Sequence, residues 1–474
     1  MRRGRTHARA NADSAGETTV ALGPLGHMIG RLRALGQIGL VRRLVKNFSI
    51  GLVGSVATAA VGVGRTVVLT KVLLDVEAYG RLLIVLNFFS LLEAVASVRV
   101  HETLYKFWPQ YEIEKDTAAL RTLFLLAFGV SGGVGLLCLI AVLTTADWVA
   151  LTLYEDASLT LPLRLYAGAI VLLSLNGVAS TLLRLEDRFA AVIIPQVVGG
   201  ILTLLLLIAY AVAAETYQIR VVVLIFLVGI IAQATPTVVQ AFRSTYRRIG
   251  GVRGARWSAL AGSKSEIYSL LFQSNLTGYL KMLSSPGDLF LLGVFGTPTQ
   301  VAFYGIAQRL LRPVRTLLQR NANMAISPEV VKLWAENKFG QIARLLRHYL
   351  MIGVGVSAGA VGVALLLDEA VIHLVSGPEY LAAAPVFNVS VLAACVTLVS
   401  VPFYAVSISM NWIYIRNIVL ISSSLLYFVF MSGGLTAIEV AYVQLAIMVM
   451  MVLFHDSFAY LKVKKMSVIP GAAN

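Results

Sequence analysis

Long apolar runs constrain this chain more than any other feature of its sequence. Runs of about 20 residues recur from Phe48 almost to the C-terminus, and each is long enough to cross a bilayer as a helix. Of the 474 residues, 58% are hydrophobic and only 13% are charged, whereas soluble domains carry about 25% charged residues. The runs are continuously apolar and do not alternate every second residue, which excludes a membrane β-barrel. We therefore predict an all-α, polytopic membrane protein.

The runs predict about twelve transmembrane helices. The seventh and eighth are the least apolar, because the seventh contains Lys281 and Asp288 and the eighth contains four arginines. The twelve are expected near residues 48–70, 78–98, 119–143, 162–182, 189–213, 219–242, 266–292, 299–325, 346–366, 383–409, 412–432 and 436–461.

The distribution of positive charge predicts the orientation of these helices. With a cytoplasmic N-terminus, 29 of the 39 Lys and Arg residues fall on inner segments and only 3 on outer loops. Such a bias is the positive-inside pattern of membrane proteins. Both termini are therefore expected in the cytoplasm. The net charge of +15 is explained by this topology, and no nucleic-acid partner is expected.

The chain also predicts two halves. A basic, Gly-rich segment lies between the sixth and seventh helices, and DVEAYGRLLIVL in the first half resembles QVAFYGIAQRLL in the second. Parallel halves of this kind place a substrate site between them, near the middle of the membrane. We expect two six-helix bundles around a central cavity. The predicted parts are a basic cytoplasmic tail (1–47), an N-terminal bundle (48–242), a cytoplasmic linker (243–265), a C-terminal bundle (266–461) and a cytoplasmic tail (462–474).

Charged residues inside the predicted helices point to a site. Each costs about 2.5–3.5 kcal/mol to insert, so such residues usually face a cavity or one another. Four arginines share one broad face of the eighth helix, and a guanidinium donates two hydrogen bonds to a phosphate. The alternatives are that Arg315 and Arg320 extend to lipid phosphates and that Arg309 pairs with Asp288. The set comprises Arg65, Glu93, Arg164, Lys281, Asp288, Arg309, Arg312, Arg315 and Arg320.

Signatures of enzymes and metal sites are missing from the sequence. It contains no GxSxG, HExxH or P-loop motif, its six histidines are scattered, and the outer loops are short. We expect a non-enzyme without metal or cofactor. The carboxylates of Glu93 and Asp288 are expected to balance charge or to couple transport to a gradient of H⁺ or Na⁺, because buried carboxylates can exchange protons.

Four stretches carry a family resemblance. LTKVLLDVEAYGRLLIV has a basic residue, two leucines, an acidic pair and Tyr-Gly, with Lys71 where Arg is usual and Asp75 where Gly is usual. GDLFLLGVFGTPTQVAFYGIAQRLL has Asp288, Tyr304 and Arg309 at matching positions. MAISPEVVKLWAENKFGQIARLLRHY and VIHLVSGPEYLAAAPVFNVSVL supply a Pro-containing inner stretch and a Gly-x-x-Tyr-x-x-Ala turn. In these stretches the chain resembles the oligosaccharide and polysaccharide flippases of the MOP superfamily, which export lipid-linked O-antigen or exopolysaccharide units.

The resemblance implies a function. Such proteins flip undecaprenyl-pyrophosphate-linked sugars from the cytoplasmic to the periplasmic leaflet of the bacterial inner membrane, by alternating access between two bundles, for the synthesis of lipopolysaccharide or exopolysaccharide. Polysaccharide polymerase and glycosyltransferases are the partners it suggests, beside the lipid-linked oligosaccharide and membrane lipids. We expect Arg65, Arg309, Arg312 and Lys281 to bind the cargo. The alternatives are a multidrug or peptidoglycan-precursor exporter of the same superfamily, and a non-transporting scaffold of a polysaccharide assembly complex.

Overall fold

The chain is helical wherever its structure is described. The computed structural model describes residues 39–96, 98–282, 286–410, 412–425 and 434–468, and within these residues it contains no strand. The all-α prediction is confirmed. The chain divides into two parts, Met1–Gly51 and Leu52–Asn474. The first contributes only the start of helix α2, and the contacts below all lie within the second part.

The helices of the first half follow the predicted membrane segments closely, and the predicted fifth helix has the observed bounds. Two π-helical turns, η1 (Leu69–Leu73) and η2 (Val149–Leu153), extend α2 and α5, and a short turn, η3 (Ala157–Leu159), precedes α6. The helices are α2 (Gly39–Val68), α3 (Val76–Ala96), α4 (Val100–Ile113), α5 (Thr117–Trp148), α6 (Thr160–Ala167), α7 (Ala169–Leu185), α8 (Phe189–Ala213) and α9 (Ile219–Arg248).

The helices of the second half are longer or more interrupted than predicted. A 3₁₀ turn, η4 (Trp257–Ser263), precedes them, another, η5 (Pro378–Ala383), leads into α14, and a π-helix, η7 (Met451–Asp456), joins α17 to α18. The helices are α10 (Lys264–Met282), α11 (Pro286–Phe295), α12 (Pro298–Ala335), α13 (Phe339–Ser376), α14 (Ala384–Ser409), α15 (Ile413–Ser424), α17 (Ala437–Met450) and α18 (Ser457–Val468).

Eight helical segments of the described chain are long and apolar enough to cross a membrane, and α6 and α7, bent by 42° relative to each other, make a ninth as one broken span. The protein is thus a polytopic membrane protein. The predicted seventh, eighth and eleventh spans are not among these segments. The seventh covers parts of α10 and α11, with residues 283–285 outside the described residues. Helix α12 carries the arginines of the eighth, and residues 426–432 of the eleventh lie outside the described residues.

Two elements have bounds that differ from the predicted ones. Helix α11 begins at Pro286, which suits a first helical turn because its missing N–H would be unpaired there in any case. The predicted linker starts later than expected, because α9 continues to Arg248. The predicted division into two bundles stays a prediction, and most of the predicted N-terminal tail lies outside the described residues.

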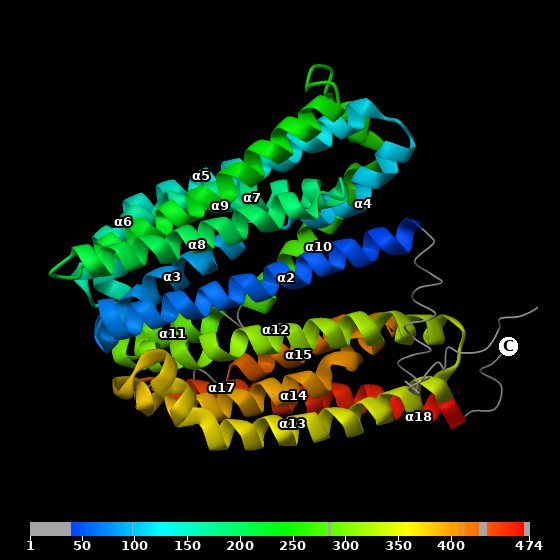
Figure 1. Ribbon diagram of the computed structural model, residues 1–474. Helices are drawn as coiled ribbons and strands as arrows, with labels where there is room; N and C mark the ends of the chain where they lie inside the picture. The colour runs from blue at the N-terminus through cyan, green and yellow to red at the C-terminus, as the bar shows by residue number, and fades with distance from the viewer. Residues whose placement is uncertain (1–38, 97, 283–285, 411, 426–433, 469–474) are drawn as a thin grey trace, which may run out of the picture. The chain divides into compact units, whose positions relative to one another are not determined.

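The helices pack in two sets of neighbours, which Figure 1 displays in green-cyan and yellow-red. In one set α5 packs on α7, and α9 packs on both α7 and α8; in the other, α14 packs on α12, α13 and α17. Helix α3 contacts both sets, since it lies against α7 and also against α11 and α12. The α3–α12 contact is thus the place where distant parts of the sequence meet.

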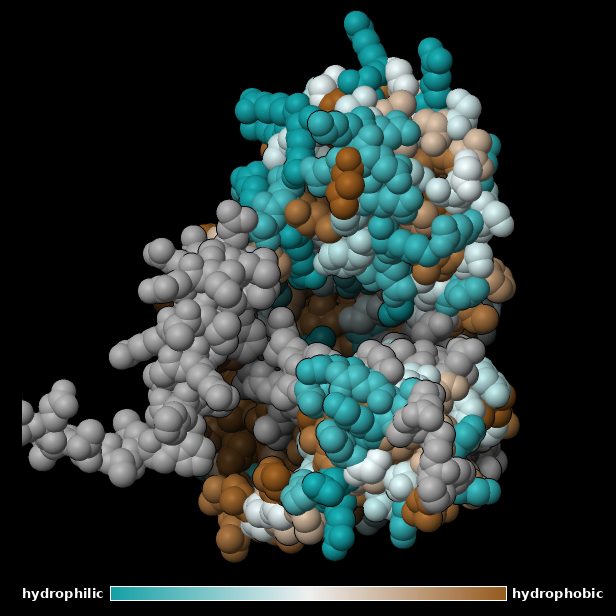
Figure 2. All heavy atoms as spheres, turned by 90° about the vertical axis from the view of Figure 1, so that its right-hand side faces the viewer, coloured by the Kyte–Doolittle hydropathy of each residue, from teal (hydrophilic) through white to brown (hydrophobic). Residues whose placement is uncertain are grey.

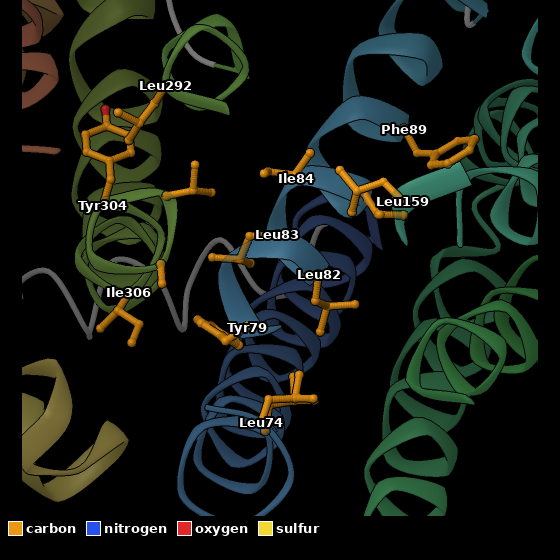
Figure 3. Close-up of a cluster of buried hydrophobic side chains, with 14 of the residues drawn as sticks. Leu74, Tyr79, Leu82, Leu83, Ile84, Phe89, Leu159, Leu292, Tyr304 and Ile306 are labelled. Atoms are coloured by element: carbon orange, nitrogen blue, oxygen red, sulfur yellow. The ribbon is translucent and has the colours of Figure 1, made fainter. Parts of the chain in front are cut away.

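Tyr-Gly pairs from the two halves meet at this contact. A Cβ atom on Gly80 would lie 1.8 Å from the Pro298 carbonyl oxygen, and one on Gly305 would lie 2.2 Å from a methyl group of Leu83. Only glycine allows the backbones to approach this closely. Figure 3 shows Leu83 of α3 between α3 and α12, and Tyr304 on α12.

The Gly-x-x-Tyr-x-x-Ala turn joins the same contact. Gly377 ends α13 with φ = 100°, a conformation that favours glycine. The turn buries Tyr380 edge-on against Tyr79, with ring centroids 6.0 Å apart. Residues from three of the four stretches that carry the family resemblance therefore pack together.

Candidate functional site

Two arginines from distant helices lie over aromatic rings. The guanidinium carbon of Arg65 on α2 is 5.7 Å from the ring centre of Phe226 on α9, and that of Arg309 on α12 is 5.5 Å from the ring centre of Tyr79 on α3. Both arginines are half-buried. A cation over an aromatic face is attracted by the ring quadrupole, which positions the guanidinium without neutralising its charge.

The charges of these two arginines act on each other. Arg65 and Arg309 repel each other, and Tyr166 of α6 lies within electrostatic reach of both. Within the described chain, none of Arg65, Arg309 and Arg312 forms an ion pair. No ion pair between Arg309 and Asp288 is found among the described residues, and the alternative that they pair stays a prediction.

Glu93 is the carboxylate that belongs to this group. It is half-buried on α3 and is attracted by the exposed Arg312, and Tyr166 lies within electrostatic reach of it. We call Arg65, Glu93, Arg309 and Arg312 the arginine cluster. Three positive charges in it face one negative charge, which leaves an excess of positive charge among apolar helices.

Asp288 lies in a different network. Its carboxylate is only 2% exposed and accepts a hydrogen bond from the Tyr304 hydroxyl at 3.0 Å. The same hydroxyl lies 3.3 Å from Oε1 of Gln444, which also accepts a hydrogen bond from Nε2 of Gln308 at 3.2 Å. Nε2 of Gln308 reaches Oγ of Ser390 at 3.3 Å. The structure thus separates the two predicted carboxylates.

A cavity of about 170 Å³ adjoins this network. Its polar lining comes from Arg315 and Gln319 of α12, Thr397 of α14 and Gln444 of α17, and Ala393, Ala394 and Met448 complete it. The amide nitrogen of Gln319 is buried and has no hydrogen-bond partner in the described chain. An unpaired buried donor costs about 1–3 kcal/mol, so a polar ligand that accepted its hydrogen would recover this energy.

The other charged residues singled out from the sequence have simpler positions. Arg164 is exposed and forms an ion pair with Asp147, with Nη2 and Oδ2 2.6 Å apart. Lys281 lies in the last turn of α10, and Arg320 in the middle of α12, but the side chains of both lie outside the described residues. Among the described residues, no group of His, Cys, Asp or Glu side chains is arranged to hold a metal ion.

Sequence reasoning missed the polar residues without charge. Tyr166 lies within electrostatic reach of the arginine cluster, and Gln308 and Gln444 belong to the network around Asp288. In a sequence, however, a single Tyr or Gln inside an apolar run cannot be told apart from an ordinary packing residue. Gln308 stands next to Arg309 in the sequence, and this Gln-Arg pair inside a predicted span was the one available sign.

Hydrophilic side chains gather at one end of the molecule. Figure 2 shows this end, the right-hand side of Figure 1, as largely hydrophilic and hollowed between an upper and a lower group of hydrophilic side chains. The exposed basic residues Arg247, Arg248 and Arg253 and the exposed Lys338, Arg344 and Arg347 belong to segments predicted to be cytoplasmic.

The fold is that of known membrane transporters. The chain is similar to the structure of the lipid II flippase MurJ in an inward closed conformation, with a TM-score of 0.61, 15% identity and coverage of 88% of this chain and 91% of that one. It is also similar to an inward-facing multidrug resistance MATE family transporter of the MOP superfamily, with a TM-score of 0.69, 16% identity and coverage of 87% and 96%. At these identities the likeness establishes the fold.

The family follows from the sequence. The family model described as "Polysaccharide biosynthesis protein" matches residues 68–385, and the chain belongs to this family. No curated protein has a significant sequence match to the chain. The fold and the family together confirm the predicted resemblance to flippases of the MOP superfamily.

Proposed function

We propose that the protein flips a polyprenyl-pyrophosphate-linked oligosaccharide from the cytoplasmic to the periplasmic leaflet of a bacterial inner membrane, by alternating access. The observation that carries this proposal is the excess positive charge of the arginine cluster. Arg65 and Arg309 lie over aromatic rings, and among the described residues neither forms an ion pair with a carboxylate. A pyrophosphate supplies the missing negative charge, and its oxygens match the paired donors of a guanidinium.

The polar cavity supports an oligosaccharide cargo. Amide, hydroxyl and guanidinium groups of Gln319, Thr397, Gln444 and Arg315 line it, and these groups donate to and accept from the hydroxyls of a sugar. A lipophilic cation, the usual cargo of a drug exporter, would gain nothing from a site rich in arginine. The family description favours a surface polysaccharide as the product of the pathway, that is, lipopolysaccharide or exopolysaccharide. It favours this product over a peptidoglycan precursor.

Glu93 and Asp288 take separate roles in this proposal. Glu93 balances part of the charge of the arginine cluster, because Arg312 attracts it. Asp288 is too buried to meet the cargo and is the candidate for coupling to H⁺ or Na⁺. Lys281 completes the predicted cargo-binding set. Glycosyltransferases that build the lipid-linked unit and a polymerase that consumes it are the expected partners, and transport requires no chemical step.

The test is a complementation experiment. Cells lacking the gene should accumulate the lipid-linked sugar, and the wild-type chain should restore surface polysaccharide. Arg309→Ala should reduce export by about 10- to 100-fold, because even one lost hydrogen bond to a charged group costs about 1.5–3 kcal/mol. Arg309→Lys should restore part of the export, since it keeps the charge and loses the fork.

The matched control is Arg220→Ala. Arg220 is exposed and bonded to its neighbour Gln218, so its loss should leave export unchanged. Membrane levels of all variants are measured by immunoblotting. Normal surface polysaccharide in a well-expressed Arg309→Ala strain would refute the proposed site. Accumulation of lipid II in the deletion strain would favour the peptidoglycan-precursor alternative.

A further inference from the structure

The cavity between α12, α14 and α17 has a lining rich in hydrogen-bond donors. Its polar side chains are those of Arg315, Gln319, Thr397 and Gln444, and no carboxylate of the described chain lines it. A guanidinium has five N–H donors and no acceptor, and each amide nitrogen adds two donors. The lining therefore carries the positive charge of Arg315 without a negative charge beside it.

The protein's own hydrogen bonds leave several of these donors available. Nε2 of Gln319 is buried and has no partner in the described chain. Oε1 of Gln444 accepts a hydrogen bond from Nε2 of Gln308 at 3.2 Å, whereas none of the hydrogen bonds described for Gln444 uses its amide nitrogen. The hydroxyl of Thr397 donates to the carbonyl oxygen of Ala393 at 2.7 Å. Two amide nitrogens thus remain for a ligand.

Arg315 supplies the charge of this cavity. It is half-buried and forms no ion pair in the described part of the chain. It lies within electrostatic reach of the Tyr304 hydroxyl, which donates to Asp288, but Asp288 does not line the cavity. Burying a charge is costly unless it is paired and hydrogen-bonded, so an anion bound beside Arg315 would stabilise this arrangement.

The volume of the cavity limits the size of the ligand. Sites for drug-sized molecules have volumes of about 300–1,000 Å³, whereas this cavity has about 170 Å³. That volume exceeds what a single water molecule needs, yet it is too small for a polyprenyl chain or for several sugars. The cavity therefore fits one small polar group, together with the part of a sugar that carries it.

The charge of the cavity favours a carboxylate as this group. A carboxylate carries one negative charge, and its two oxygens match the paired donors of a guanidinium. Its remaining lone pairs can accept hydrogen bonds from the amide nitrogens of Gln319 and Gln444. A neutral hydroxyl would leave the charge of Arg315 unbalanced. A pyrophosphate carries more negative charge and is better matched by the arginine cluster, none of whose members lines the cavity.

We propose that this cavity is a carboxylate-binding subsite, in which Arg315 pairs with the carboxylate and Gln319 and Gln444 donate to it. The ligand is an acidic sugar of the cargo, such as a uronic acid. This inference rests on the proposed function, because it takes the ligand to be part of a lipid-linked oligosaccharide. It adds that the protein recognises two negatively charged groups of its cargo at two separate places.

The test compares two soluble sugars that differ in one group. Binding of methyl glucuronide and of the neutral methyl glucoside to the full-length chain is measured by saturation-transfer nuclear magnetic resonance. The chain is held in nanodiscs of phosphatidylcholine, which has no net charge. The glucuronide should bind about 10- to 100-fold more tightly, the effect of one hydrogen bond to a charged group. Equal binding of the two sugars, or binding of neither, would overturn the proposal.

Substitutions locate the site. Arg315→Gln should weaken binding of the glucuronide to the level of the glucoside. Gln319→Met keeps the length of the side chain and removes the amide, and it should weaken glucuronide binding by a smaller factor. The matched control is Arg220→Gln, at an exposed position outside the cavity, which should bind the glucuronide as the wild type does. Thermal unfolding of each variant verifies that it is folded.

Two results would assign the carboxylate or the cavity differently. Binding of the glucuronide that is kept in Arg315→Gln and lost in Arg309→Gln would place the carboxylate in the arginine cluster and contradict the proposal. Tight binding of inorganic pyrophosphate that is lost in Arg315→Gln would show that the cavity holds the lipid pyrophosphate instead. Failure of these tests would leave the flippase proposal standing with a neutral cargo, because that proposal is tested by the lipid-linked sugar that accumulates in the deletion strain.

Discussion

Two glycines set the distance between α3 and α12. Gly80 faces the backbone carbonyl of Pro298, which cannot move aside without shifting the start of α12, and Gly305 faces the flexible tip of Leu83. Substitution at Gly80 should therefore be worse tolerated than substitution at Gly305. This contrast depends on what each glycine touches, because both residues lie inside helices.

Gly80→Ala should destabilise the protein by about 1–3 kcal/mol, the usual cost of an extra methylene in a packed contact. The measurement is thermal unfolding of the purified chain in detergent. Gly62→Ala serves as the control, since nothing lies within 4 Å of a Cβ atom there, and it should unfold at the wild-type temperature or slightly above. Equal unfolding temperatures for the two variants would contradict the close approach.

The sequence singles out charged residues inside the helices, whereas it gives no signal for uncharged polar ones. Arg65, Glu93, Arg309 and Arg312 stand out because charge inside an apolar run is costly, and the structure brings these four together. Asp288 stands out for the same reason, yet it lies apart with Tyr304. Helix packing determines which charged residues lie near one another. A hydropathy pattern contains no information on that packing.

At the scale of elements, one ion pair joins α3 to the turn between η2 and η3. Nε of Arg81 on α3 lies 2.7 Å from Oδ2 of Asp156, which caps η3 by accepting a hydrogen bond from the Ser158 N–H at 2.9 Å. Burial opposes ionisation of Asp156, but these hydrogen bonds and the charge of Arg81 outweigh it and hold its pKa below the ordinary value.

The lowered pKa predicts how stability depends on pH. The ionised form of Asp156 stabilises the fold at every pH above its unfolded-state pKa, about 3.9, and this contribution is lost as the pH falls through the lower folded-state value. Asp156→Asn should therefore unfold at a lower temperature than the wild type at neutral pH. The difference should shrink below about pH 4, as measured by thermal unfolding across pH. A difference that is constant with pH would show that the carboxylate charge is not responsible.

Helix positions were predictable where hydropathy alone decides them. The predicted range 189–213 equals α8 because a continuous apolar run ends at polar residues on both sides. The predicted range 266–292 covers most of α10 and the first residues of α11, and residues 283–285 between them lie outside the described residues. The length of α12 was underestimated, because the helix continues past the end of its apolar run, through the polar residues Arg320, Asn321 and Asn323, to Ala335.

For the whole molecule, the direction of insertion is the main prediction. The basic segments predicted to be cytoplasmic include the exposed Arg253, whereas the exposed Glu215 lies in a loop predicted to be periplasmic. In a chain whose two cysteines, Cys138 and Cys395, are replaced by serine, Glu215→Cys should react with a membrane-impermeant maleimide in intact spheroplasts.

Arg253→Cys should react only after the membrane is permeabilised. Both positions are exposed, so a difference in labelling reports the side of the membrane and not burial. Labelling of both cysteines in intact spheroplasts, or the reverse pattern, would show that the positive-inside bias misplaces the chain.

The lengths of α12 and α13 have a geometric consequence. Each contains 38 residues, and at 1.5 Å per residue each is about 57 Å long, whereas the hydrocarbon layer is about 30 Å thick. The charged residues from Glu329 to His348 surround their short connection, so the surplus length lies at that end. Each helix is therefore about 27 Å longer than the hydrocarbon layer is thick. A hollow of about 320 Å³ lies between the two helices near their connection and is lined by polar residues such as Glu329, Gln341 and Arg344.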